Sequence, residues 1–195
     1  MKIIEPSVEL VDDIDGQQIL RKLELCGKVS RKSQPGDAES FVRSIIKRGH
    51  ESVLEHVSLT FHIVCDRAIM AELTRHRLAS FTVESTRYVK YDELTVIQPP
   101  LPTADAIIGF RYSIREIERL YEMFIKNGEK PEKARAVLPL CLATELYMTA
   151  NLREWRHVLK LRTDKAAHPQ MRVVAGQILE ILRDKLPVIV EDINP

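Results

Sequence analysis

Apolar and polar positions alternate most clearly in the segment 57–65. Its apolar positions share one face of an extended chain: Val57, Leu59, Phe61, Ile63 and Cys65. A period of two over this length predicts a β-strand with one buried face. His62, on the same strand, is expected to be a buried, hydrogen-bonded histidine. Residues 2–11 alternate more loosely and are expected to form an edge strand.

Predicted helices lie on both sides of this strand. The spacing of apolar residues predicts helices over Asp15–Lys28, Gly36–Gly49 and Asp66–Arg77, the last with Asp66 as its N-cap. The segment Ala79–Lys90 is rich in Ser, Thr, Phe, Val and Tyr, which favours a loop or a strand. The Pro-Pro-Leu-Pro run at 99–102 marks the one linker-like break.

Beyond Thr103 the chain is predicted to be helical almost to its end. Asn127-Gly128 closes a first long helix, and Pro131 suits the first turn of the next. The first helix carries a stripe spaced by three and four residues: Ile107, Phe110, Ile114, Ile117, Tyr121 and Phe124. A similar stripe precedes Pro187: Ala167, Met171, Val174, Ile178 and Ile181. We therefore expect one α+β domain over 1–195, with a small antiparallel sheet in the first half packed with long helices.

Composition narrows the class of protein. The 195 residues are 45% apolar and 29% charged, as in a globular protein. With 29 basic and 28 acidic residues the net charge is +1, so any anion-binding function must come from a local cluster. Three widely spaced cysteines give neither a disulfide framework nor a metal knuckle. No signal peptide or membrane-spanning stretch is evident, and a reducing cytoplasm is the expected location.

The densest polar cluster is the segment 75–88. It opens with Arg-His-Arg and continues to Ser85, Thr86 and Arg87. Cations near a helix C-terminus also have a structural explanation, since they oppose the helix dipole. The two hydroxyls and the third arginine favour a binding site instead, because these groups hold phosphate and the planar edge of a nucleobase.

The other polar segments have simpler explanations when taken alone. Segment 49–56 contains two histidines six positions apart, the wrong spacing for metal ligands on one helix face, so no metal site is expected. Six basic residues between Arg153 and Arg172 fit a solvated helix face, and Arg135, beside an apolar run, fits a surface position. The chain contains no GxSxG, GxGxxG or GxxxxGK motif, and its cysteines fit packing positions.

Five ordered elements resemble the flavin-dependent thymidylate synthase family. The Arg-His-Arg at 75–77, seven intervening residues, then Ser85 and Arg87-Tyr88 are similar to the hallmark of that family. Segments 49–56 and 133–139 resemble its upstream His-rich loop and its Arg-x-x-Leu-Pro element. The late flavin and substrate segments are matched by Asn151, Arg153, Leu161 and Arg162. Together the matches span residues 49–172.

The resemblance implies both a fold and a reaction. The fold is the thymidylate synthase-complementing fold. The reaction makes dTMP from dUMP, with methylenetetrahydrofolate as carbon donor and NADPH as reductant through FAD. It implies a homotetramer whose subunits share active sites. Because the flavin supplies the redox chemistry, no catalytic cysteine is needed. Arg162 is the implied catalytic residue, since a guanidinium stabilises the ionised uracil without exchanging a proton.

The same resemblance implies the binding residues. It assigns dUMP to Glu72, Arg75, Ser85, Thr86, Arg87, Arg135 and Arg162. It assigns FAD to Ser52, Glu55, Arg75, His76, Arg77, Asn151, Arg153 and His157. The chain departs from the family pattern at Thr82 and Val83, where Asn and then Glu or Gln are common. Val83 offers no polar side chain, and Glu84, a candidate replacement, faces the other side of a strand.

Two further classes of protein compete with the enzyme. A nucleic-acid-binding module would use the basic segments 75–90 and 153–172, with nearby aromatic residues stacking on bases. The near-zero net charge opposes this alternative, and neither nucleic acid nor membrane is expected as a partner. A helical interaction protein would use the 107–124 stripe, but the core needs that stripe as well.

Overall fold

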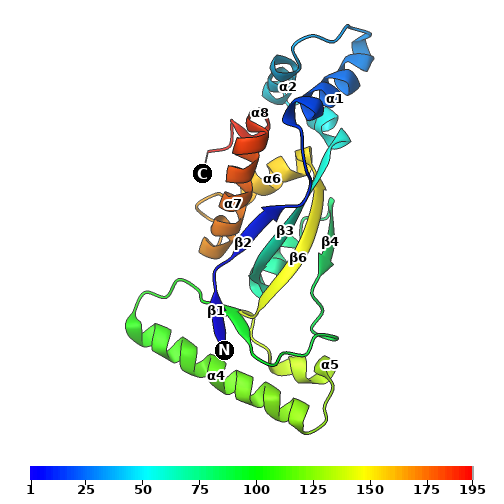
Figure 1. Ribbon diagram of the computed structural model, residues 1–195. Helices are drawn as coiled ribbons and strands as arrows, with labels where there is room; N and C mark the ends of the chain where they lie inside the picture. The colour runs from blue at the N-terminus through cyan, green and yellow to red at the C-terminus, as the bar shows by residue number, and fades with distance from the viewer. Residues whose placement is uncertain (195) are drawn as a thin grey trace.

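The computed structural model describes residues 1–194, apart from the side chain of Arg31, and its centre is an antiparallel sheet (Figure 1). The sheet has the order β2-β3-β6-β4, and a separate parallel pair joins β1 to β5. The strands are β1 (Lys2–Ile4), β2 (Ser7–Leu10), β3 (Ser58–Asp66), β4 (Ala79–Val83), β5 (Thr95–Ile97) and β6 (Ala143–Asn151). The predicted α+β class is confirmed.

The first residues form two strands instead of one. The chain passes Pro6 between β1 and β2, and the two strands enter different sheets. Proline donates no backbone hydrogen bond, which suits this break between strands. The prediction of an edge strand is right for β2, which pairs only with β3 in the sheet order.

The second half of the chain is not helical throughout. Strand β6 lies between β3 and β4 and pairs with both, so the prediction of a sheet confined to the first half is wrong. Its alternation is clear in the structure, since Leu146, Met148 and Ala150 are buried while Glu145 and Tyr147 are exposed. In the sequence this alternation follows an apolar run over 136–144, which hides its period.

The early helices agree with the predicted ones apart from their ends. They are α1 (Gly16–Lys28), α2 (Ala38–Lys47) and α3 (Arg67–Leu73), and the short 3-10 helices are η1 (Val29–Arg31) and η2 (Glu51–His56). The Asp66 side chain caps α3, accepting from the backbone of Ile69 at 2.7 Å. Helix α3 ends at Leu73, so Arg75 and His76 follow the helix in a turn instead of closing it.

Helices of 4 to 23 residues follow beyond Thr103, in addition to the missed strand, so helices are present where they were predicted but not all of them are long. They are α4 (Ala104–Lys126), α5 (Pro131–Ala134), α6 (Leu152–Arg162), α7 (Pro169–Lys185) and α8 (Pro187–Val190), with the 3-10 helix η3 (Arg135–Val137) after α5. In Figure 1, α4 lies across one end of the molecule, away from α6 and α7. Of its predicted stripe only Ile114 and Tyr121 are fully buried. None of the helices within residues 1–194 has the length and apolar character needed to cross a bilayer.

One face of the sheet carries the main core. Phe61 and Met148 on the strands are fully buried together with Trp155 on α6 and Val174 on α7. The ring of Phe61 meets that of Trp155 edge to face at a centroid distance of 4.9 Å. His62 points to the other face with 22% of its side chain exposed, where it contacts Glu145. The prediction of a buried His62 is therefore wrong, although its hydrogen bond is present.

Candidate active site

Polar side chains gather in two places on the sheet. The first place is the end of β6 at Asn151, where Ser58 of β3 and Ala79 of β4 lie alongside. The second lies beyond the far end of β4, in the segment after Val83. We call these the α6 site and the loop site. Leu78 precedes β4 and Ser85 follows it, so the α6 site and the loop site lie roughly 20 Å apart along that strand.

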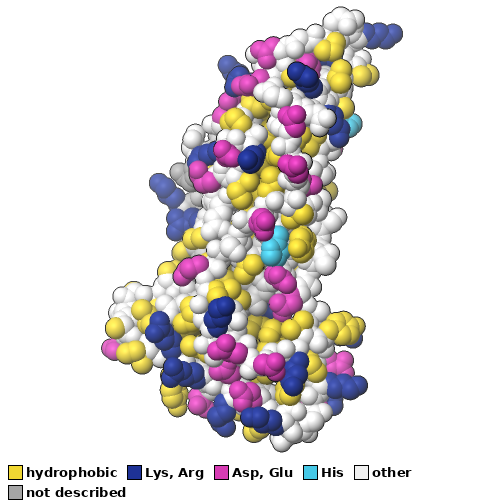
Figure 2. All heavy atoms as spheres, viewed as in Figure 1, with side chains coloured by type: hydrophobic (Ala, Val, Ile, Leu, Met, Phe, Trp, Pro, Cys, Tyr) yellow, Lys and Arg dark blue, Asp and Glu magenta, His cyan; other side chains and the backbone are white. Residues whose placement is uncertain are grey.

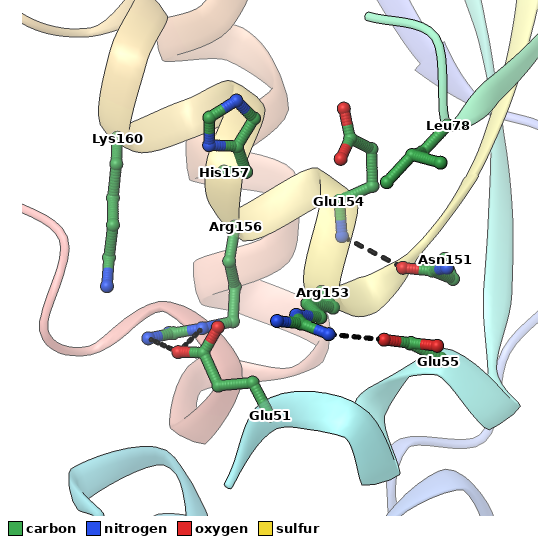
Figure 3. Close-up of a pocket in the computed structure, with 9 residues that line it drawn as sticks. All are labelled: Glu51, Glu55, Leu78, Asn151, Arg153, Glu154, Arg156, His157 and Lys160. Atoms are coloured by element: carbon green, nitrogen blue, oxygen red, sulfur yellow. Dashed lines mark hydrogen bonds and ion pairs between the residues drawn. The ribbon is translucent and has the colours of Figure 1, made fainter. Parts of the chain in front are cut away.

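The α6 site consists of two hollows that share His157. The first, about 550 Å³, is drawn in Figure 3 and is lined by Glu51, Glu55, Leu78, Asn151, Arg153, Glu154, Arg156, His157 and Lys160. The second, about 580 Å³, is lined by Glu72, Arg75, His76, His157, Leu161 and Arg162. Each has a volume typical of a pocket for a cofactor or substrate.

Helix α6 is fixed beneath the first hollow by its cap and its apolar face. Asn151 accepts from the backbone of Glu154 at 2.9 Å and so caps the helix. The indole of Trp155 donates to the carbonyl of Leu59 at 3.0 Å. These contacts leave Arg153 on the hollow's side, where it donates to Glu55 at 2.6 Å (Figure 3). The first turn of α6 thus presents the Arg153 cation and the positive end of the helix dipole to the hollow.

Arg156 contradicts the prediction that this helix has a solvated basic face. Its side chain is 1% exposed and donates to Glu51 at 3.0 Å, to Asp192 at 2.7 and 2.8 Å, and to the carbonyl of Ile189. The Arg156 hydrogen bonds lower the pKa of Asp192 to about 2. Lys160 contacts the same carboxylate at 3.2 Å. This network ties η2 and the C-terminal segment to α6, so it shapes the hollow's wall.

Arg162 is held in the second hollow by three hydrogen bonds. Its Nη1 donates to Glu72 Oε2 at 2.8 Å, its Nη2 to the Glu72 carbonyl at 3.1 Å, and its Nε to His76 Nε2 at 3.1 Å. A guanidinium has five N–H groups, so each Nη keeps a second one for a ligand. With 15% of its side chain exposed, Arg162 is a preorganised cation at the hollow's surface.

His76 connects this arginine to a buried carboxylate. Because the guanidinium keeps its proton, Nε2 of His76 is the accepting nitrogen, and the neutral ring carries its proton on Nδ1. That Nδ1 lies 3.4 Å from Glu154 Oε1. Burial lowers the pKa of His76 to about 4, with Arg162 and His157 adding to the effect. The imidazole is therefore neutral near pH 7, and the carboxylate fixes its tautomer.

The same residues form a group with the ligand types of a metal site. Atoms of His76, Glu154 and His157 lie within 4.8 Å of one another. This trio could not be predicted from the sequence, because its members come from a turn and from α6. Both nitrogens of His76 already face Arg162 and Glu154, so the hydrogen-bond chain accounts for the close approach.

The loop site brings together hydroxyls and arginines from distant segments. Ser85 Oγ accepts from the backbone of Arg87 at 3.3 Å, and the Ser85 carbonyl accepts from Tyr88 and Val89 at 3.1 and 3.0 Å. Arg135 reaches from η3 to Thr86 Oγ1 at 3.5 Å. Arg87 and Arg135 are exposed and Ser85 and Thr86 are half-buried, so the loop site offers two guanidinium groups and two hydroxyls.

The structure divides the predicted residues between these sites. Glu72, Arg75, His76, His157 and Arg162 line the second hollow, and Glu55, Asn151, Arg153 and His157 line the first. Ser52 and Arg77 are exposed neighbours of the lining residues Glu51 and Leu78. The remaining four lie in the loop site: Ser85, Thr86, Arg87 and Arg135.

Sequence reasoning missed several residues of the first hollow. Glu154, Arg156 and Lys160 line it alongside the predicted residues. One signal was available, since Asn151 followed three residues later by Glu154 has the spacing of a helix N-terminus. The burial of Arg156 had no such signal, because its acidic partners Glu51 and Asp192 lie far away in the sequence.

Comparisons with known proteins agree with one another. Residues 9–188 match the family described as thymidylate synthase complementing protein. The chain is 35% identical over 185 residues to a probable flavin-dependent thymidylate synthase of Mycobacterium phage L5, covering 86% of this chain and 76% of that protein. A flavin-dependent thymidylate synthase of Pyrococcus furiosus is 35% identical over 166 residues, covering 82% and 66%.

Among solved structures, the fold is similar to the UMP/dUMP methylase PolB from Streptomyces cacaoi bound with 5-Br dUMP. The TM-score is 0.84 at 25% sequence identity, over 98% of this chain and 96% of that one. The same protein bound with 5-Br UMP gives a TM-score of 0.82. Almost the whole chain therefore has a counterpart of similar fold among solved structures.

Proposed function

The chain belongs to the thymidylate synthase complementing protein family of flavin-dependent thymidylate synthases, and from this premise we propose how its residues divide the work. The reaction is the methylation of dUMP to dTMP with FAD as cofactor. We assign base activation to the second hollow, flavin binding mainly to the first, and phosphate binding to the loop site. Methylenetetrahydrofolate and NADPH are the proposed carbon donor and reductant.

Arg162 is the proposed catalytic residue. The observation that supports this role is its fixed geometry, with three hydrogen bonds that leave one N–H on each Nη. Those N–H groups would donate to the carbonyl and ring-nitrogen edge of uracil, where negative charge develops. Since the guanidinium is always charged, it stabilises that charge without moving a proton. Arg75, in the same hollow, would lie between dUMP and the flavin.

The proposed dUMP site combines residues from both places. Ser85, Thr86, Arg87 and Arg135 offer hydroxyls and guanidinium groups of the kind that bind phosphate, and Arg135 is already next to Thr86. Glu72 would lie near the nucleotide through its contact with Arg162.

The residues of the α6 site fit a flavin dinucleotide. The chemistry of the donor set supports this fit, because Arg153 and the N-terminus of α6 offer positive polarity to a diphosphate. The proposed FAD residues are Ser52, Glu55, Arg75, His76, Arg77, Asn151, Arg153 and His157. Bound FAD supplies the reducing equivalents for forming the methyl group. The three thiols are free, and Cys65 and Cys141 have pKa values raised by burial to about 12 and about 11, so they are poor nucleophiles.

Assembly of subunits would complete the active site. The loop site and the α6 site, which includes the second hollow, lie at opposite ends of β4, and this strand is longer than the reach of a nucleoside monophosphate. We therefore propose that residues 1–195 form one domain, that four copies form a homotetramer, and that one copy's loop site serves another copy's α6 site. The free thiols fit a reducing cytoplasm as the location of this assembly.

The contacts of segment 153–172 favour the enzyme over the nucleic-acid alternative. Arg153, Arg156, Lys160 and Arg162 of segment 153–172 each contact a carboxylate on another element. Figure 2 shows acidic and basic side chains interspersed over the visible face instead of a basic stripe. A nucleic-acid surface needs an excess of unpaired cations.

A flavin spectrum tests the proposed function. The purified protein, supplied with FAD, should show flavin absorbance at about 450 nm, and adding dUMP should perturb that band. UMP should be titrated in parallel, because the solved neighbour is a UMP/dUMP methylase. Formation of dTMP with methylenetetrahydrofolate and NADPH completes the test. A protein that takes up no FAD, or whose flavin band ignores dUMP, would contradict the proposal.

A further inference from the structure

The segment that carries the loop site is closed by a bond between its two ends. The six residues Ser85–Lys90 lie between Glu84 and Tyr91. The Tyr91 hydroxyl donates to Glu84 Oε1, so the two flanking side chains meet. Burial and the Glu84 carboxylate raise the pKa of Tyr91 to about 12, so the hydroxyl keeps the proton it donates at any ordinary pH.

Arg67 fastens the first end of this loop to α3. Its Nη2 donates to the Glu84 carbonyl at 3.2 Å and contacts Glu84 Oε1 at 3.5 Å. Both side chains are mostly buried, with 16% and 21% exposed. A hydrogen bond that involves a charged group is stronger than one between two neutral groups, so the guanidinium makes this attachment firm. Glu84 is also paired through its backbone to the carbonyl of Glu145 on β6 at 3.0 Å.

Tyr121 fastens the second end to α4. The backbone N–H of Tyr91 donates to the Tyr121 hydroxyl at 3.3 Å, and the two rings meet at a centroid distance of 5.9 Å. Tyr121 is 1% exposed, so this attachment point is part of the protein interior. The loop is thus held between the sheet and α3 on one side and α4 on the other.

We propose that Glu84 and Tyr91 are positioning residues for the nucleotide phosphate: their side-chain bond, backed by Arg67, holds Ser85, Thr86 and Arg87 in a binding-competent arrangement. This inference rests on the proposed function, which places the dUMP phosphate at those three residues. A loop that is ordered before binding loses less entropy when the ligand arrives, and the gain appears as affinity. Neither Glu84 nor Tyr91 contacts the nucleotide in this account.

The same geometry settles the role of Glu84 in the departure from the family pattern. Its carboxylate is engaged by Tyr91 and Arg67, and so it does not replace a polar nucleotide contact at Val83. Val83 itself packs against the core. Glu84 thus stabilises the loop through its contacts with Tyr91 and Arg67.

Tyr91→Phe is the sharpest test, because it removes one oxygen and keeps the ring. The flavin band reports dissociation constants for dUMP and for deoxyuridine, which lacks the phosphate. We expect Tyr91→Phe to weaken dUMP binding about fivefold to tenfold, roughly the effect of one lost hydrogen bond, and to leave deoxyuridine binding unchanged. Glu84→Leu should weaken dUMP binding further, whereas Glu84→Gln, which keeps an acceptor, should fall between Glu84→Leu and wild type. Tyr112→Phe, on the exposed face of α4, is the matched control and should bind like wild type.

The dissociation constants of FAD, dUMP and deoxyuridine, together with the melting temperature, decide the outcome. The FAD dissociation constant and the melting temperature should stay close to wild type in Tyr91→Phe, which shows that the loss is local. Equal losses for dUMP and deoxyuridine, or no loss for dUMP, would overturn the positioning role. Different results would contradict the proposed function itself: a wild-type protein that does not bind dUMP, or an Arg87→Ala variant that binds dUMP as tightly as wild type. If Glu84→Leu does not fold, Tyr91→Phe alone carries the decision.

Discussion

Replacing Arg162 by lysine tests whether the planar guanidinium, and not merely a positive charge, drives the reaction. In the structure the side chain bridges Glu72 and His76 through three different nitrogen atoms. A lysine ammonium has one nitrogen on a flexible stem. If it keeps the ion pair with Glu72, it loses the contact with His76 and can no longer aim two parallel donors at uracil.

The expected loss follows from the number of donors. Removing one preorganised donor to a developing negative charge typically costs about 3–4 kcal/mol, which corresponds to roughly 100-fold to 1,000-fold in turnover. Substrate binding should suffer less, because the phosphate contacts lie in the loop site. We therefore expect Arg162→Lys to lower kcat by about that factor while the KM for dUMP changes by roughly tenfold or less.

Turnover is measured as dTMP formed per flavin, with methylenetetrahydrofolate and NADPH in excess. The flavin spectrum of the variant, recorded with and without dUMP, checks that the variant binds FAD and dUMP. Arg119→Lys provides the matched control, because Arg119 pairs with Glu116 on the exposed surface of α4. It should keep wild-type turnover. An Arg162→Lys enzyme that works within about threefold of wild type would refute the role of the planar fork.

Three further predictions concern other parts of the molecule. Ser85→Cys should leave the protein folded and weaken dUMP binding about tenfold in the flavin titration, because a thiol is a poor partner for phosphate; unchanged affinity would argue against a phosphate contact. The pKa of Asp192 is lowered to about 2, so its pairing with Arg156 stabilises the fold above its ordinary pKa near 4 and is lost as the pH falls toward 2. Asp192→Asn should therefore lower the melting temperature at pH 7 and reduce the decrease in melting temperature between pH 5 and pH 2. A variant whose melting temperature equals that of the wild type at pH 7 and at pH 2 would contradict this. Nitrogen NMR should show His76 neutral down to about pH 4 with its proton on Nδ1. Glu154→Leu should disturb that tautomer and lower kcat about tenfold. A proton on Nε2 in the wild type would exclude the series of hydrogen bonds from Arg162 through His76 to Glu154.

The sequence predicted those elements whose pattern is local. Strand β3 and helices α1, α2 and α7 were visible because one periodic face of each packs on the core. Strand β6 was hidden, since its alternation merges with the apolar run before it. What selects the strand is pairing on both sides with β3 and β4, which are distant in sequence.

The candidate site was predicted by residue type and order but not by arrangement. Arg162 and Glu72 were both named, yet their ion pair depends on how α6 packs beside α3. Glu154 was missed because its partner His76 comes from another element. The sequence suggests Glu84 as a nucleotide contact, whereas its bonds to Tyr91 and Arg67 give it a supporting role that only the fold reveals.

A subunit-mixing experiment tests the shared active site most directly. Arg162→Ala disables the α6 site and Arg87→Ala the loop site, so each variant alone should be nearly inactive. If the two sites of one active centre come from different copies, unfolding and refolding the variants together in equal amounts should restore about a quarter of wild-type activity, since half of the copies carry each intact site. A mixture as inactive as its components would contradict the account.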